Sequence, residues 1–347
     1  MDAKNPRINL LDVAKHAGVS PATVSRVLNN TAPVRESVRS RVLSSMKSLG
    51  YEPPRGKTLA VSLENALALL IPDILNPFFA EIVRGVQDDA TAAGFMPILL
   101  DTNEDAQREQ QILRRLSGQS FSGIIMCGSR LSPDELLTIH GRRDTPMVII
   151  NRSIRHPNIA CIVVDNENAT YRAARHLLDL NHTRIAFLSG PIKSAQSQSR
   201  HRGVEKALAE AGLALRAELC PASFPGVDGG FQAMSALLAL PCAERPTAVI
   251  AYNDLMAMGV LHAIRAHHLR VPEDISVVGF DDIAMAAHTN PPLTTVSQPK
   301  YRMGRLAMQT LRRMIQGYPP PEEGFTLMES PLIVRESTAL APTNNGS

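Results

Sequence analysis

The chain of 347 residues is 44% hydrophobic and 20% charged, which is typical of a globular protein with two or three domains. Its first residues contain no apolar core of signal-peptide length, and no uncharged apolar stretch is long enough to span a bilayer, so we expect a cytoplasmic protein. The four cysteines form no metal-binding or disulfide pattern, and we expect neither a metal nor another cofactor: Cys127, Cys161, Cys220 and Cys242.

The charge is distributed unevenly along the chain. Residues 1–59 contain ten Lys/Arg and four Asp/Glu, a net charge of +6, whereas the remaining residues contain 26 basic and 29 acidic side chains, a net charge of −3. A compact basic segment joined to a mildly acidic body is the electrostatic pattern expected of a polyanion-binding module attached to a regulatory domain.

Residues 1–50 predict an all-α domain of three short helices. Asn9 and Asp12 can form a capping box at the start of the first helix, and Gly18 is suited to end it in the left-handed conformation. Ser20 can cap a second helix that has Pro21 at its first position, and a third helix runs from about residue 36 to 49. Because so short a glycine-containing turn joins the first two helices, we expect a helix-turn-helix.

The second helix is the candidate DNA-reading element. If it enters the major groove, Arg26 can recognise a guanine through two hydrogen bonds, whereas Pro21 and Ala22 can make only apolar contacts. Short polar side chains suited to phosphate contacts lie on or beside the same helix: Ser20, Thr23, Ser25 and Asn29. The spacing alone is equally compatible with an ordinary three-helix bundle in which Arg26 is a solvated surface charge.

Residues 12–29, DVAKHAGVSPATVSRVLN, resemble the DNA-binding signature of the lactose/galactose repressor (LacI/GalR) family over eighteen positions. The resemblance implies a homodimer that binds a pseudo-palindromic operator, with one recognition helix on each half-site. It also implies that Arg26 contacts a base and that Pro21 and Ala22 set the operator preference.

Residues 51–64 correspond to the hinge of that family. The resemblance implies that this segment becomes a short helix on operator DNA and inserts Leu59 into the minor groove, which unstacks a base step and bends the duplex. Pro54 and Gly56 depart from the family pattern, and glycine disfavours a helix by about 1 kcal/mol relative to alanine. A flexible linker with Leu59 packed on the core is the alternative interpretation.

From about residue 66, short apolar runs alternate with helix-period segments, which predicts α/β architecture with doubly wound parallel sheets. So many repeats favour two sheets over one very wide sheet. The predicted strands are Leu67–Ile71, Met96–Leu100, Gly123–Cys127, Met147–Ile150, Cys161–Val164, Arg184–Leu188, Ala248–Tyr252 and Ser276–Phe280.

Polar residues follow these strands, at the sheet edge where parallel sheets bind ligands. They include Asp73, Asn76, Asp101, Asn103, Ser129, Asn151, Arg152, Asp165, Asn166, Asn253, Asp254, Asp281 and Asp282. Together with Phe78 and Phe79, such carboxylates, amides and arginines suit a neutral polyhydroxyl ligand. The alternative for the polar residues, above all Asp254, is capping of the next helix, and the alternative for Phe79 is the core.

Residues 253–254, 278–282 and 291–296 also resemble the repressor family, so the likeness covers essentially the whole chain. It implies a core like that of periplasmic sugar-binding proteins, with an effector between two lobes. The lobes would be about residues 65–165 plus 295–325 and residues 166–294 plus 326–340, followed by a tail, 341–347. The family's effector positions match Phe78, Phe79, Arg200, Asn253 and Asp281, and an aromatic residue that closes the pocket matches Phe224.

We therefore expect a DNA-binding transcriptional repressor whose small effector is a sugar, with a purine or nucleoside as the alternative because Phe78 and Phe79 could sandwich a base. The tail has no heptad repeat, so we expect a dimer formed by the lobe nearer the DNA. A sugar-binding protein without a regulatory role would have no reason for a helix-turn-helix. An enzyme is disfavoured because no nucleotide-binding glycine motif or catalytic constellation is evident.

Overall fold

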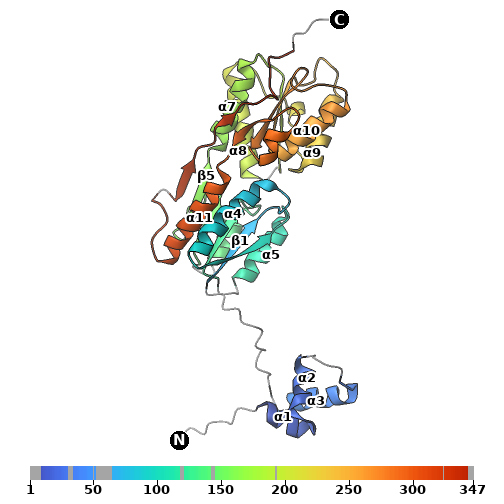
Figure 1. Cartoon of the computed structure of the whole chain (residues 1–347), viewed down its shortest axis with the longest axis vertical. Helices are drawn as coiled ribbons and strands as arrows, with labels where there is room; N and C mark the ends of the chain where they lie inside the picture. Colours follow the sequence, from blue (N-terminus) through green and yellow to red (C-terminus); the bar gives the residue numbers. More distant parts are fainter. Residues whose placement is uncertain are drawn as a thin grey trace. The chain divides into compact units, whose positions relative to one another are not determined.

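The computed structural model describes residues 9–29, 34–49, 51, 65–117, 121–141, 145–191, 194–322 and 324–342. The chain divides into two compact units, residues 1–62 and 63–347 (Figure 1). The predicted hinge residue Leu59 lies outside the described residues.

The first unit contains the three predicted helices, α1 (Leu10–Ala17), α2 (Pro21–Asn29) and α3 (Glu36–Leu49). Asn9 and Asp12 form the expected capping box, and Gly18 ends α1 with a φ of 64°, which is the left-handed conformation. Their small apolar core is built from Val13, Ala14, Ala17, Val24, Val27, Val42, Met46 and Tyr51.

The second unit contains two lobes, each built on its own sheet, as the sequence predicts. The first lobe has a parallel six-stranded sheet in the order β10-β5-β4-β3-β1-β2. Its strands are β1 (Ala66–Ile71), β2 (Met96–Asp101), β3 (Gly123–Cys127), β4 (Met147–Ile150), β5 (Ile159–Val164) and β10 (Phe325–Met328). Helices pack on opposite faces of this sheet, α4 (Pro77–Ala92) and α11 (Lys300–Ile315) on one and α5 (Ala106–Leu116) and α6 (Pro133–His140) on the other.

The second lobe has a five-stranded sheet in the order β11-β9-β8-β7-β6, in which only β11 pairs antiparallel to its neighbour. Its strands are β6 (Ile185–Leu188), β7 (Ala248–Ala251), β8 (Ser276–Asp281), β9 (Thr294–Ser297) and β11 (Leu332–Ile333). The sheet lies between α7 (Asn166–Asp179) with α8 (Ala195–Glu210) and α9 (Val227–Leu238) with α10 (Asp254–Ala266).

All eight predicted strands are present, with ends that agree within two residues, but β9, β10 and β11 are absent from the prediction. Their sequences contain no long apolar run: β9 begins with two threonines, β10 is half-buried at a sheet edge, and β11 has two residues. The predicted lobe boundaries at residues 294/295 and 325/326 therefore need correction. β9 keeps residues up to 297 in the second lobe, and β10 keeps residues 325–328 in the first.

Two glycines allow α4 and α11 to pack closely side by side in the first lobe (Figure 1). A Cβ atom on Gly85 would lie 2.2 Å from the Tyr301 carbonyl oxygen, and one on Gly304 would lie 2.1 Å from the Ile82 carbonyl oxygen. Because glycine has no Cβ, the backbones of α4 and α11 come into close contact at these two positions. In the described part of the chain, no helix is long and apolar enough to cross a membrane.

Candidate effector and DNA-binding sites

The first two turns of α2 carry the residues with the predicted base-reading role. Pro21, Ala22 and Arg26 are exposed, whereas Thr23 and Ser25 are half-buried. The exposed Ser20 caps the helix, since its Oγ accepts a hydrogen bond from the Thr23 backbone N–H at 3.2 Å. The side chain of Asn29 is not among those that the structure describes. The residues with the predicted base-reading role are therefore all accessible to solvent.

A cavity lies between the two lobes, with about 520 Å³ of empty space when the open solvent at its mouth is included. The ends of strands from both sheets and the first turn of α4 line it. This is the location that the strand-end rule predicts for a ligand.

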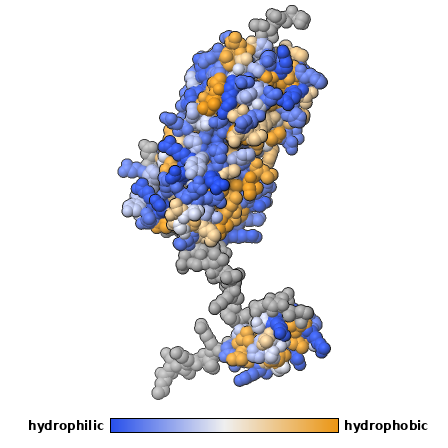
Figure 2. Space-filling view, in the orientation of Figure 1, coloured by the Kyte–Doolittle hydropathy of each residue, from blue (hydrophilic) through white to orange (hydrophobic). Residues whose placement is uncertain are grey.

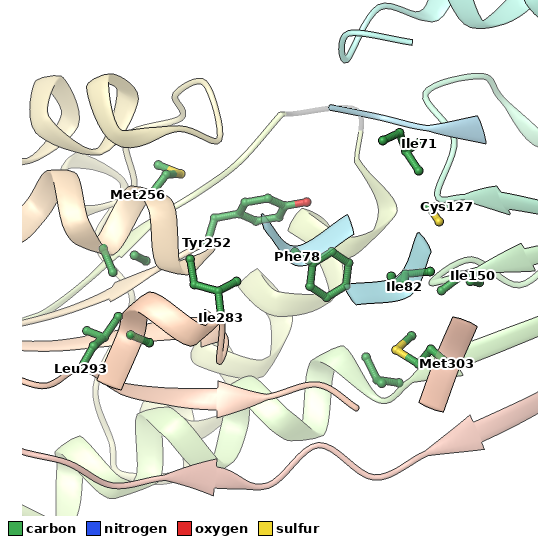
Figure 3. Close-up of a cluster of buried hydrophobic side chains, with 14 of the residues drawn as sticks. Ile71, Phe78, Ile82, Cys127, Ile150, Tyr252, Met256, Ile283, Leu293 and Met303 are labelled. Carbon is green, nitrogen blue, oxygen red and sulfur yellow. The ribbon is translucent and has the colours of Figure 1, made fainter. Parts of the chain in front are cut away.

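The first lobe supplies the aromatic wall of this cavity. Asn76 caps α4 by accepting a hydrogen bond from the Phe78 N–H at 3.0 Å, with Pro77 at the first helical position. This local sequence places Phe78 and Phe79 in the first turn, where their rings meet edge to face at a centroid distance of 5.1 Å. Phe78 and Tyr252, which come from different lobes, belong with Cys127 to one buried cluster (Figure 3), and all three residues line the cavity.

Arg200 is the buried cation of the second lobe's wall, and its side chain is only 4% exposed. Its guanidinium lies 3.5 Å from the centroid of Phe280 and 4.6 Å from that of Tyr252. Nε donates to Asn166 Oδ1 at 2.9 Å, and Nη1 donates to the Tyr252 carbonyl oxygen. Burial lowers the pKa of Arg200, while Tyr252 and Asp281 raise it. The guanidinium is thus held rigidly before any ligand enters.

Asp281 is the carboxylate that faces Arg200, with Oδ1 4.0 Å from Nη2. Its Oδ1 also accepts a hydrogen bond from Gln298 Nε2 at 2.7 Å, and its backbone has a φ of 120°. Burial raises the pKa of Asp281, against the opposing effect of Arg200, Gln298 and Lys300. A buried carboxylate beside a fixed guanidinium is suited to bind hydroxyl groups, which donate to one and accept from the other.

Asn253, rather than Asp254, caps α10. Its Oδ1 accepts a hydrogen bond from the Met256 N–H at 2.8 Å, and its Nδ2 donates to the Pro225 carbonyl oxygen at 2.9 Å. Asp254 instead connects α10 to β9 and to the segment after β8. Its carboxylate accepts hydrogen bonds from Thr295 Oγ1 at 2.6 Å and from the Ile283 N–H at 2.9 Å. The predicted capping role of Asp254 is therefore wrong.

The cavity brings together five of the seven predicted effector residues, Phe78, Phe79, Arg200, Asn253 and Asp281. Ser129 does not line it, because its hydroxyl turns into the lobe and donates to Glu109. Phe224 also lies outside, on the loop before α9, with 60% of its surface exposed. This geometry does not support either residue as a direct ligand contact.

Seven further polar or aromatic residues line the same cavity: Asn76, Glu104, Arg130, Asn151, Gln196, Tyr252 and Gln298. Asn151 is one of the polar residues that the sequence analysis selects at strand ends, and Tyr252 is the last residue of the predicted strand Ala248–Tyr252. Asn151 Nδ2 donates to Gln298 Oε1 at 3.1 Å, and its buried Oδ1 has no hydrogen-bond partner among the described residues. Gln196 is near the start of a helix and Arg130 is in a loop, and no sequence signal marks either position.

No cluster of His, Cys, Asp or Glu that could hold a metal ion occurs among the residues that the structure describes. The chain matches the family model for bacterial regulatory proteins of the lacI family over residues 9–54 and that for a periplasmic binding protein-like domain over residues 174–338.

Known proteins resemble the chain over nearly its whole length. It is 34% identical to the HTH-type transcriptional repressor CytR of Escherichia coli K12 over 332 residues, 95% of this chain and 96% of that protein. A structure of the transcriptional regulator CelR in complex with cellobiose aligns with a TM-score of 0.70 at 32% identity and covers 95% of this chain and 100% of its own. A lac repressor dimer bound to operator and the anti-inducer ONPF also gives a TM-score of 0.70, at 28% identity and 96% and 99% coverage.

The similarity to these repressors extends from the helix-turn-helix through the two-lobed core. The prediction of the family from residues 12–29 is confirmed. The chain belongs to the lacI family of bacterial regulatory proteins.

Proposed function

We propose that this protein represses transcription under the control of a neutral, sugar-containing effector that binds in the interlobe cavity. As a member of its family it is a DNA-binding transcriptional regulator and not an enzyme. The observation that carries the proposal is the pair formed by Asp281 and Arg200, both buried at the cavity with their charged atoms 4.0 Å apart. Such a pair can bind adjacent hydroxyl groups, while Phe78 covers the apolar side of a ring.

The similar structures support a sugar ligand. CelR is described in complex with cellobiose, and a further lacI-family regulator, from Enterococcus faecium, is described with bound ribose, at 26% identity and a TM-score of 0.69. A purine or nucleoside is the second candidate, because Phe78, Phe79 and Tyr252 provide aromatic surfaces on two sides of the cavity.

We further propose that α2 reads operator DNA through Arg26, Pro21 and Ala22. Support comes from the exposure of these three residues and from the basic character of residues 1–59. Phosphate contacts by Ser20, Thr23, Ser25 and Asn29, and minor-groove insertion of Leu59, belong to the same proposal.

A homodimer would place two such helices on a pseudo-palindromic operator, and we propose the edge strand β2 and the loop after β1 as its interface. Ile74, Leu75 and Met96 are more than half exposed, and β2 has a neighbour on one side only. Exposed apolar side chains on a sheet edge are characteristic of protein interfaces. Figure 2 shows hydrophobic residues at the surface of the same lobe.

Contacts between the lobes suggest how an effector would act. Lys300 Nζ donates to the Asp281 carbonyl oxygen at 2.9 Å and lies 3.5 Å from Glu81 Oε1 in α4. A ligand that bridges Asp281 and Phe78 would favour the lobe arrangement in which both reach it. Operator affinity can then change only by the ratio of the ligand's affinities for the two arrangements.

The test combines thermal unfolding with operator binding. D-ribose, D-glucose, cellobiose, adenosine and cytidine are added in turn to wild-type protein and to the Asp281→Asn variant, with Asp179→Asn on the exposed end of α7 as the control. A ligand of the native state raises the melting temperature in wild type and the control but not in Asp281→Asn. An equal rise in all three proteins would place the ligand elsewhere. Fluorescence anisotropy with operator DNA then shows whether the ligand weakens or strengthens DNA binding.

A further inference from the structure

An ion pair lies in the wall that the first lobe contributes to the cavity, whereas Asp281 and Arg200 belong to the second lobe. Glu104 follows β2 and Arg130 follows β3. Arg130 Nε donates to Glu104 Oε2 at 2.5 Å, and Nη2 contacts the same oxygen. The two side chains are only 11% and 10% exposed, and both line the cavity.

The protein holds this pair in place through a second layer of contacts. Glu109 of α5 is only 2% exposed and accepts hydrogen bonds from the Arg130 N–H at 2.8 Å and from Ser129 Oγ. Burial raises the pKa of Glu109, but these bonds and the charges of Arg130 and Arg152 oppose the shift. Arg152 Nη1 donates to the Leu131 carbonyl oxygen at 2.5 Å. The loop that carries Arg130 is therefore fixed on both sides.

The backbone of Glu104 is fixed as well. Its N–H donates to the Pro72 carbonyl oxygen at 2.7 Å, and its φ of 56° is in the left-handed region. Among the described residues, neither Glu104 nor Arg130 forms a hydrogen bond with Asp281 or Arg200. The Glu104–Arg130 pair is therefore a second polar centre in the same cavity. A pre-formed polar centre needs little reorganisation when a ligand binds.

The contacts within the pair leave Nη1 of Arg130 and Oε1 of Glu104 without a hydrogen bond to another of the residues that the structure describes. One is a donor and the other an acceptor, and the pair as a whole is neutral. It complements a ligand edge on which an acceptor and a donor are neighbours, and it disfavours an edge that carries a net charge. Phe78 and Phe79 belong to the same lobe, so a flat ring could lie against an aromatic side chain with its edge toward the pair.

We propose that Glu104 and Arg130 determine specificity by reading the polar edge of a heterocyclic base whose attached sugar binds Asp281 and Arg200. The inference rests on the proposed function, since it assumes that effectors enter this cavity. Ser129 and Glu109 are positioning residues that act through Arg130.

The experiment measures binding by isothermal titration calorimetry to full-length protein. The probes are adenosine, cytidine and uridine, and methyl β-D-ribofuranoside serves as the probe that lacks a base. Glu104→Gln keeps the size of the side chain and removes its charge, whereas Arg130→Lys keeps the charge and removes the planar fork. Arg108→Lys is the matched control. Arg108 belongs to the same lobe and does not line the cavity, and its Nη2 lies 3.9 Å from Asp101 Oδ2.

We expect Glu104→Gln and Arg130→Lys to weaken the tightest nucleoside about ten- to hundredfold, the usual effect of losing a hydrogen bond to a charged group. Binding of methyl β-D-ribofuranoside and of operator DNA should stay within about twofold of wild type in both variants, and Arg108→Lys should behave as wild type.

Three results would overturn the inference. Unchanged nucleoside affinity in both variants would exclude contact with the base. An equal loss for the nucleosides and the methyl riboside would indicate a structural role. Wild-type binding of D-ribose, D-glucose or cellobiose without nucleoside binding would also overturn it and leave the proposed function intact, whereas no binding of any probe would contradict both.

Discussion

Arg200→Met is expected to destabilise the second lobe and to abolish effector binding, because it removes a buried guanidinium but keeps an unbranched side chain. The substitution leaves Asn166 Oδ1 and the Tyr252 carbonyl oxygen without their donors. It also removes from the buried Asp281 the cation with the larger effect on its pKa and leaves Lys300. Breaking a buried charge pair costs about 3–5 kcal/mol. Since the carboxylate and the guanidinium are 4.0 Å apart rather than in direct contact, we expect the lower end, about 3 kcal/mol.

The control is Arg202→Met, two residues along the same helix. Arg202 donates to Glu167 Oε2 at 2.8 Å, but its side chain is 54% exposed, and surface pairs contribute only about 0–1 kcal/mol. Urea unfolding followed by circular dichroism gives the free energy for each variant, which suits a chain without tryptophan. In an Asp281→Asn background, Arg200→Met should cost less, because no charge is then left unpaired. Equal losses for Arg200→Met and Arg202→Met would refute the reasoning.

Three more outcomes follow from single residues. Arg26→Ala should weaken operator binding by about 1–3 kcal/mol in anisotropy titrations and spare unrelated DNA; equal losses on both DNAs would exclude base reading. Burial lowers the pKa of His182, so the unfolded chain takes up the proton first, and stability should fall as the pH drops below about 6.5. Urea titrations at several pH values should show a weaker dependence in His182→Gln; the same dependence as in wild type would assign it to other groups. Gly304→Ala places a Cβ 2.1 Å from the Ile82 carbonyl oxygen and should lower the free energy of unfolding more than the control Gly212→Ala. Gly212 has a φ of 72° and open space around it, so its substitution should cost only the roughly 1–2 kcal/mol of backbone strain. A smaller loss in urea unfolding for Gly304→Ala than for Gly212→Ala would show that the helices can separate.

The parts of the fold that local chemistry determines could be read from the sequence. The capping box of Asn9 and Asp12 and the left-handed Gly18 are contained within ten residues, and the structure confirms them. Buried strands of parallel sheets are continuous apolar runs, so β3 and β4 could be predicted to the residue. β9 and β10 could not, because their strand conformation depends on pairing with β8 and β5, which lie elsewhere in the chain.

The cavity residues divide in the same way. Asn253 and Asp281 end or follow apolar strands, so the strand-end rule selects them, whereas Arg200 lies within α8 and only the family resemblance indicated it. Glu104 and Arg130 meet because β2 and β3 both flank β1, an order that the sequence does not show. Pairing across a sheet is a tertiary property, and such residues become visible only in the folded chain.

Gln298 connects the carboxylate of Asp281, in the second lobe, to Asn151 in the first lobe. It follows β9, where the chain returns to the first lobe; its Nε2 donates to Asp281 Oδ1 at 2.7 Å, and its Oε1 accepts from Asn151 Nδ2 at 3.1 Å. A hydroxyl group that donates to Asp281 must share or replace the Gln298 bond, and a replaced amide would also lose its alignment with Asn151. Because the three groups belong to both lobes and to the segment between them, ligand binding and lobe arrangement are energetically linked. A coupling of about 1–3 kcal/mol, the size usual for allosteric proteins, requires no more than one or two such bonds to differ between the two arrangements.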